Sequence, residues 1–294
     1  MRRFWSWLVG SSVVVALATF GIGSVGTATA GAAQGGTVRA AATSPCTPPF
    51  PNQPYWQGWD IATGVALLHD GTCRGYVLDG WGGFHPFGNP PPPALFGGKH
   101  AVGQVVAHNM AIEGSDVLNP TNPPVRGAVI NTHAKAYPFG ANGVTPVTYA
   151  TNDQSYLYNV PTRAISLDPA PAGSAYNLNG ATIDAWGGIH PFSTVTETID
   201  TCNAPYWPKW NIVRGLALLP NGQGGFTLDG WGGVHAFGKA QLATPPDTYW
   251  GPSFGHKAWD IARGVAIDNN GNGVVLDGWG GLHPFTYTIN AAGC

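Results

Sequence analysis

The chain has 294 residues, of which 10% are charged and 12% aromatic, and it contains 43 glycines and 26 prolines. All 15 acidic residues lie after residue 54, whereas Arg2, Arg3 and Arg39 lie before it, so the region from residue 55 has a formal net charge of −5. Nucleic acids and anionic membrane surfaces attract basic clusters, so this charge argues against both as partners.

The first 30 residues have the features of a secretory signal peptide. Two arginines follow Met1, residues 4–25 carry no charge, and Ala28-Thr29-Ala30 fits the cleavage rule. An uncleaved membrane anchor is the alternative, because the uncharged run is long enough to span a bilayer. Residues 31–54 are rich in Ala, Gly, Thr and Pro, as exported linkers are. We therefore predict a secreted, extracellular protein with no membrane span after signal cleavage.

Four later segments are nearly identical in sequence. They share the pattern (Leu/Ile)-Asp-(Gly/Ala)-Trp-Gly-Gly-x-His-(Pro/Ala)-Phe and cover residues 78–87, 183–192, 228–237 and 276–285. Their aspartates are 105, 45 and 48 residues apart. The first gap is about twice the others, and a degenerate copy at residues 128–140, with Asn131 in the aspartate position, divides it. The sequence thus predicts five units with spacings of 45 to 53 residues in the region 55–294.

Each unit also has an upstream half that predicts a strand. The clear copies are residues 59–67, 210–218 and 259–267, the weaker ones are 108–112 and 163–167, and the dipeptides Tyr55-Trp56, Tyr206-Trp207 and Tyr249-Trp250 precede the clear copies. Short apolar, β-branched or aromatic runs alternate with Gly, Asn, Asp and Pro, which is typical of strands and turns. Asp70-Gly71 and Asn270-Gly271 lie where hairpin turns are expected.

These features predict an all-β fold, a five-bladed β-propeller. Three or four strands in every unit of about 45 to 50 residues match the known period of propeller blades. A single blade cannot bury its own apolar face, so five blades are expected to close into a ring. A linear β-solenoid is the alternative, but its rungs are normally shorter.

The four cysteines are Cys46, Cys73, Cys202 and Cys294. An even number in an exported chain suggests two disulfides. Cys46 precedes the first unit and Cys294 is the last residue, so a bond between them could clasp a closed ring. Local pairing of Cys46 with Cys73 is the equally weighted alternative.

The repeated aspartates and tryptophans are the candidate ligand-binding residues. They are Asp79, Trp81, Asp184, Trp186, Asp229, Trp231, Asp277 and Trp279. An aspartate at a turn accepts hydrogen bonds from backbone N–H groups, and this structural role is favoured over binding a sugar hydroxyl. The indoles either pack against the next blade or offer flat faces on which sugar rings stack. The Tyr-Trp dipeptides are a second candidate surface.

The repeated histidines, at positions 85, 190, 235 and 283, favour a structural role over metal binding. Residues 268–273 faintly resemble a calcium loop but lack the bidentate glutamate, so a plain hairpin is preferred. We therefore predict no metal site and no cofactor.

An enzyme remains an alternative function. Glutamate occurs only at positions 113 and 197, in or beside the two divergent units. Near Glu113 lie His100, His108 and His133, and these groups could form an acid–base site of a hydrolase. Divergence without function produces the same pattern, and the familiar catalytic motifs are absent from the sequence.

The repeated unit resembles repeats of secreted bacterial proteins that form β-propellers, and the count of five is similar to that of tachylectin-type lectins. Over residues 55–287 the resemblance implies a propeller, and the lectins bind N-acetylated sugars through one site per blade. We therefore predict a monomeric binding module whose partner is a glycan of the cell envelope or surroundings, with an extracellular protein partner as the alternative.

Overall fold

The computed structural model describes eight segments of the chain. They are residues 46–90, 107–112, 127–131, 136–139, 160–168, 179–192, 198–252 and 257–292. All of them belong to one compact unit, Ala40–Cys294. The predicted signal peptide and the linker up to residue 45 lie outside the described residues. Within the described segments, no helix is long and apolar enough to cross a membrane.

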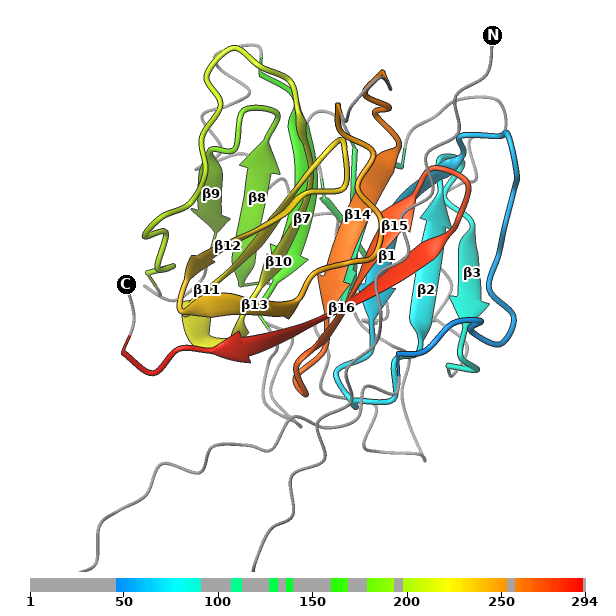
Figure 1. Cartoon of the computed structure of the whole chain (residues 1–294), viewed down its shortest axis with the longest axis horizontal. Coiled ribbons are helices and arrows are strands. Elements are labelled where there is room, and N and C mark those ends of the chain that lie inside the picture. Colours follow the sequence, from blue (N-terminus) through cyan, green and yellow to red (C-terminus); the bar gives the residue numbers. More distant parts are fainter. Residues whose placement is uncertain are drawn as a thin grey trace, which may run out of the picture. The chain divides into compact units, whose positions relative to one another are not determined.

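The fold is all-β, as predicted, and within the described segments the strands form five antiparallel sheets in chain order (Figure 1). The first sheet contains β1 (Ala62–Leu67), β2 (Gly75–Asp79) and β3 (Phe84–Phe87), and the second contains β4 (Asn109–Ile112), β5 (Gly127–Ile130) and β6 (Ala136–Phe139). The third contains β7 (Thr162–Leu167), β8 (Gly180–Asp184) and β9 (Ile189–Phe192), and the fourth contains β10 (Val213–Leu218), β11 (Gly224–Asp229) and β12 (Val234–Gly238). The fifth contains β14 (Ala262–Ile267), β15 (Asn272–Asp277) and β16 (Leu282–Ile289), with β13 (Ala240–Thr244) at its edge.

The edge strand β13 joins the sheet of the following unit rather than its own. It comes directly after β12, yet it pairs with β16 and not with β12. The 3-10 helix η3 (Pro220–Gly222) lies between β10 and β11. The degenerate second unit contains the expected strands, because β5 and β6 pair antiparallel over residues that the pattern assigned to it.

The first strand of four sheets contains a β-bulge. In the first sheet Ala62 pairs with Asp79 and Gly64 pairs with Leu78, so Thr63 has no partner on β2. The residues at the same place in the other three sheets are Arg163, Arg214 and Arg263. A bulge bends the strand and redirects the side chain of the extra residue. At four equivalent positions, the bulges therefore interrupt the regular alternation of side chains between the two faces of the strand.

The first strands contact one another in a cycle. β1 contacts β4 and β14, β10 contacts β7 and β14, and β4 contacts β7. Small residues permit this close approach. A Cβ on Gly215 of β10 would lie 2.9 Å from Val265 Cγ1 and 3.0 Å from Val265 N of β14.

The hydrophobic core consists of five clusters, and each joins two neighbouring sheets. Val77 of the first sheet packs with Leu276 of the fifth, for example, and Ile183 of the third packs with Leu216 of the fourth. The other three clusters join the first sheet to the second, the second to the third, and the fourth to the fifth. Each sheet thus buries both faces against its two neighbours.

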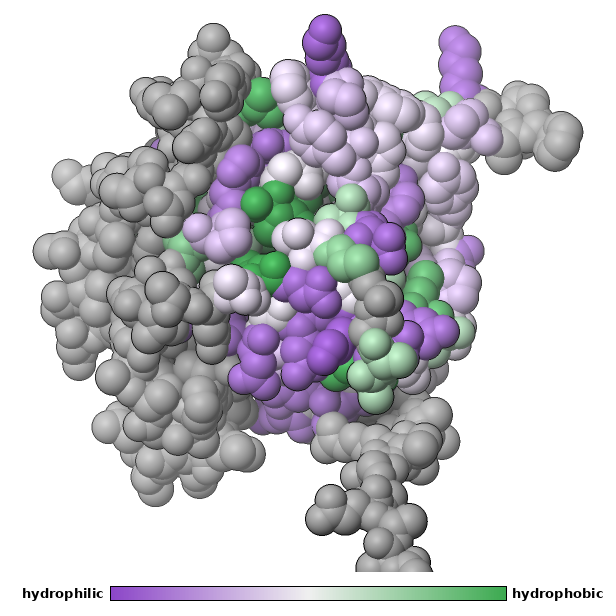
Figure 2. Space-filling model, turned by 90° about the vertical axis from the view of Figure 1, so that its left-hand side faces the viewer, coloured by the Kyte–Doolittle hydropathy of each residue, from purple (hydrophilic) through white to green (hydrophobic). Residues whose placement is uncertain are grey.

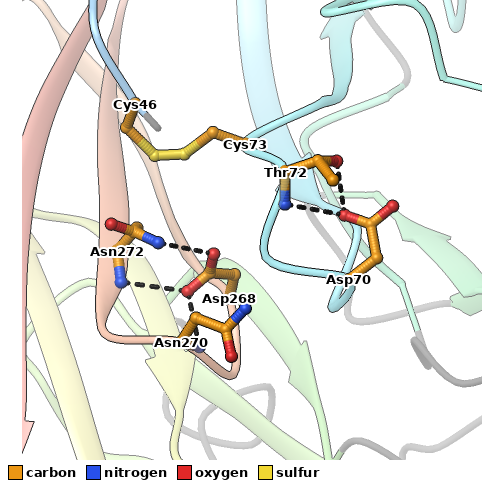
Figure 3. Close-up of a disulfide and its surroundings, with 7 residues drawn as sticks. All are labelled: Cys46, Asp70, Thr72, Cys73, Asp268, Asn270 and Asn272. Carbon is orange, nitrogen blue, oxygen red and sulfur yellow. Dashed lines mark hydrogen bonds between the residues drawn. A yellow bond between two sulfur atoms is a disulfide. The ribbon is translucent and has the colours of Figure 1, made fainter. Parts of the chain in front are cut away.

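Cys46 forms a disulfide with Cys73 in the loop between β1 and β2 (Figure 3). The clasp from Cys46 to Cys294 that the sequence left open is therefore wrong, and the local pairing is observed. Both half-cystines are buried and pack in the cluster that joins the first and fifth sheets. Cys202 is also disulfide-bonded, and Cys294 lies outside the described residues.

The segment that resembles a calcium loop is a hairpin between β14 and β15. Figure 3 shows its buried aspartate, Asp268, accepting bonds from the N–H groups of Asn270 and Asn272 at 2.8 and 2.9 Å. The other carboxylate oxygen accepts from Asn272 Nδ2 at 2.8 Å. Both oxygens of this carboxylate therefore accept hydrogen bonds from groups of the hairpin itself.

Candidate functional site

The predicted site aspartates hold the turns in which they lie. Asp79 Oδ1 accepts hydrogen bonds from the N–H groups of Trp81 and Gly83, both at 2.8 Å, and Oδ2 lies 2.8 Å from His85 Nε2. The same three contacts recur at Asp184, Asp229 and Asp277. Gly82, inside the turn, has φ of 91°, which favours glycine. The turn-bonding role expected for these aspartates is thus observed.

These contacts also determine the charge of the carboxylates. Burial raises the pKa of Asp79, but the hydrogen bonds from His85, Gly83 and Trp81 outweigh burial and keep that pKa below its usual value. The pKa values of Asp184 and Asp277 are lowered for the same reasons. These aspartates are therefore ionised at neutral pH.

Three of the four turns also contact a Tyr-Trp dipeptide that precedes the following unit. The N–H of Trp250 donates to the carbonyl of Trp231 at 2.6 Å, and the ring of Trp250 lies edge-on to His283, 5.0 Å away. Trp207 donates to Trp186 in the same way, and Trp56 donates to Trp279. The tryptophan of each dipeptide therefore packs between units, while the tyrosines at positions 55, 206 and 249 are exposed.

The repeated indoles form exposed pairs at the surface. The tryptophan that begins the upstream half of a unit packs edge-to-face against the tryptophan of the turn. The pairs are Trp59 with Trp81, Trp210 with Trp231 and Trp259 with Trp279, with ring centroids 5.3, 5.3 and 5.0 Å apart. The first-named indoles are 50%, 47% and 48% exposed. We call these the tryptophan pairs.

The sequence singled out one member of each tryptophan pair and missed the other. Trp81, Trp231 and Trp279 were predicted site residues, whereas Trp59, Trp210 and Trp259 entered only as part of a strand pattern. The shared Trp-(Asp/Asn)-Ile motif of the clear upstream halves would have revealed them. Trp186, the remaining predicted indole, is half-buried, and its backbone carbonyl accepts the hydrogen bond from Trp207 described above.

A separate polar cavity of about 280 Å³ lies where the first strands begin, and we call it the central cavity. It is lined by Asp60, Ala62, Thr63, His108, Arg163, Arg214, Asp260 and Arg263. Four of these residues are the bulge residues described above, and His108 directly precedes β4. The central cavity therefore brings together one equivalent position from each of the five units.

The arginines of the central cavity bond to the unit that follows them. Arg214 Nε donates to Asp260 Oδ1 at 2.9 Å, and its Nη2 bonds to Asp260 Oδ2. Arg263 makes the same two bonds to Asp60 of the first unit. Arg163 instead meets Asn211, whose Oδ1 accepts from Nε at 3.1 Å and from Nη2 at 2.7 Å.

Arg163 and His108 have strongly shifted pKa values. Burial, followed by the positive charges of Arg163, Arg214 and Arg263, lowers the pKa of His108 to about 4. Burial and the charge of Arg214 lower the pKa of Arg163 to about 10, which still leaves it charged at neutral pH. His108 is thus neutral, and its Nε2 accepts a bond from Arg163 Nη1 at 3.1 Å.

Of the residues predicted for an acid–base site, only His108 is described, and it lines the central cavity. Glu113, Glu197, His100 and His133 lie outside the described residues. The sequence did not single out the arginines of the central cavity. Aligning the five upstream halves with one another would have shown Thr63, His108, Arg163, Arg214 and Arg263 as one equivalent position.

Figure 2 shows one side of the molecule, where the described apolar residues form only a small area among polar ones.

No family model matches the chain, and neither does any curated protein sequence. Among solved structures, one match is a structural genomics protein of unknown function from Bacteroides thetaiotaomicron, with 10% identity and a TM-score of 0.41. The match covers 76% of this chain and 58% of that one, so this chain spans a little over half of the length of that structure.

Proposed function

We propose that this chain is a secreted five-bladed β-propeller that binds glycans of the cell envelope or surroundings. Two features support the propeller: the cycle of contacts among the first strands, and the five core clusters that join neighbouring sheets. Each sheet is then one blade, and β13 is the outer strand of the last blade.

The tryptophan pairs carry the proposal for the ligand. Sugar rings stack on exposed indole faces because these offer a large apolar area next to a polar N–H group. In each pair, the edge-to-face contact holds one indole against the turn and leaves the other about half exposed. The surface is preorganised, since little side-chain freedom would be lost on binding.

Recurrence of the tryptophan pairs suits a repetitive polymer. Three equivalent pairs lie in the first, fourth and fifth units. When one weak site is occupied by a polysaccharide, the others meet the same chain at a high effective concentration, so avidity exceeds the affinity of a single site. The turn aspartates already accept hydrogen bonds from the turns next to these pairs. We therefore assign contact with the sugar to the indoles before the aspartates.

Binding of the purified protein to a panel of glycans and envelope polysaccharides tests this proposal. We expect saturable binding with several sites per chain. The double variant Trp210→Ala and Trp259→Ala removes one exposed indole from each of two pairs and should reduce polymer binding at least tenfold. Each removed ring is still about half buried against its partner, so the free energy of unfolding should fall by about 1–2 kcal/mol per ring, and a retained cooperative unfolding transition shows that the fold persists.

Ile289→Ala is the matched control, because Ile289 is an exposed apolar side chain at the end of β16, 48% accessible to solvent. This variant should bind polymers like the unmodified protein. Failure of the whole panel, or full binding by the double tryptophan variant, would overturn the assignment and favour a protein partner instead.

A further inference from the structure

The central cavity has one position that departs from the pattern of its neighbours. Asp60 and Asp260 each neutralise the arginine of the preceding unit, whereas the equivalent residue opposite Arg163 is the neutral Asn211. Within the described part of the chain, no carboxylate lies within ion-pair distance of Arg163. Three arginines and two aspartates line the cavity with a neutral histidine, which leaves one positive charge without a counterpart.

The number of N–H groups that have an acceptor also distinguishes Arg163 from the other two arginines. A guanidinium has five N–H groups. Arg214 directs all five to acceptors: the two oxygens of Asp260, Asn211 Oδ1 and the carbonyls at positions 211 and 213. Arg263 is saturated in the same way.

Arg163 uses fewer of its N–H groups. Its Nε and one Nη2 proton share the single oxygen of Asn211, and one Nη1 proton goes to His108. One N–H on each terminal nitrogen therefore has no acceptor among the described residues. Two such N–H groups on a guanidinium match the two oxygens of a carboxylate or phosphate.

We propose that the central cavity binds one small oxyanion, a carboxylate or a phosphate, with Arg163 as its principal ligand. Its volume of about 280 Å³ is near the lower end of small-molecule pockets, about 300 Å³. The anion supplies the missing negative charge, and the ion-paired Arg214 and Arg263 add favourable potential. This site is distinct from the tryptophan pairs and does not depend on glycan binding.

Titration of the full protein with inorganic phosphate and with lactate, in a buffer of low chloride concentration, tests the proposal by calorimetry. Glycerol serves as the neutral probe. We expect one saturable site for at least one anion and none for glycerol. A preference for phosphate or for lactate identifies the source of the oxyanion.

Two variants assign the site to Arg163. Arg163→Gln removes the charge and should weaken binding at least tenfold. Asn211→Asp gives Arg163 the carboxylate partner that the other two arginines already have, so it should abolish binding without lowering the midpoint of unfolding. Absence of saturable binding by both anions, or unchanged affinity in Asn211→Asp, would refute the proposal.

Discussion

Arg263 in the last unit forms an ion pair with Asp60, which precedes the first strand and lies 203 residues away in the sequence. The equivalent contact between consecutive units joins Arg214 to Asp260, only 46 residues apart. The same type of ion pair therefore joins the last unit to the first and the fourth unit to the fifth.

Replacement of Asp60 by alanine is expected to weaken the junction between the first and last units. Asp60 is half exposed, so solvent screens the ion pair, and we expect the free energy of unfolding to fall by about 1 kcal/mol. Chemical denaturation at low and high salt measures this loss, which should shrink at high salt. Asp247→Ala, a more exposed aspartate, is the control and should change stability by about 0.5 kcal/mol or less. Equal losses in both variants would contradict a specific role for Asp60.

A second prediction about stability concerns the turn aspartates. Asp277→Ala leaves the N–H groups of Trp279 and Gly281 and the imidazole of His283 without their acceptor, so we expect a loss of about 2–3 kcal/mol. Asp277→Asn keeps an Oδ1 acceptor for the two backbone N–H groups, so its loss should be smaller. Thermal and denaturant unfolding of the two variants checks this order; because both variants lose the same charge, equal losses would show that charge rather than acceptance of hydrogen bonds is decisive.

His108 makes stability depend on pH. Its pKa is about 4 in the folded protein, well below the ordinary value of 6.5, so the unfolded chain binds this proton more readily. The folded state should therefore lose stability as pH falls from 6.5 to about 4. The charged groups that line the cavity with His108 are Arg163, Arg214, Arg263, Asp60 and Asp260.

Comparison with His108→Gln isolates this contribution from the acidic groups that titrate nearby. The difference in free energy of unfolding between the two proteins should change between pH 6.5 and 4 and be constant above pH 7.5. An NMR titration of the His108 imidazole should give its midpoint near pH 4. A midpoint near 6.5 would show that neither burial nor the arginines lower the pKa of this side chain.

Much of the fold is encoded in local patterns that repeat. Short apolar, β-branched or aromatic runs and glycine-dense turns predicted the strands of each unit, including the degenerate second one, because hairpins form from neighbouring residues. The acceptor role of Asp79 was also predictable, since its partners lie two, four and six residues away.

The composition of the candidate sites was harder to predict, because it depends on contacts between distant residues. Trp59 meets Trp81 only after β1 and β2 pair, and Arg163 meets Asn211 across 48 residues. The bulges were also hard to predict, because the register shift at Thr63 depends on how β1 pairs with β2 and leaves no periodic pattern in the sequence. The pairing of Cys46 was open for the same reason.

The disulfide between Cys46 and Cys73 should stabilise the first sheet mainly by restricting the unfolded chain. It closes a loop over a sequence separation of 27 residues, for which chain entropy suggests a contribution of about 2–4 kcal/mol. The double variant Cys46→Ser and Cys73→Ser should lose that amount in denaturant unfolding under non-reducing conditions. Both sulfurs lie in the cluster shared with Val274 and Leu276, so part of the loss comes from placing hydroxyl groups in an apolar environment. Cys46→Ala and Cys73→Ala together avoid that polar cost and should be the more stable pair. If this alanine pair unfolds at the same denaturant concentration as the unmodified protein, the cross-link contributes nothing to stability.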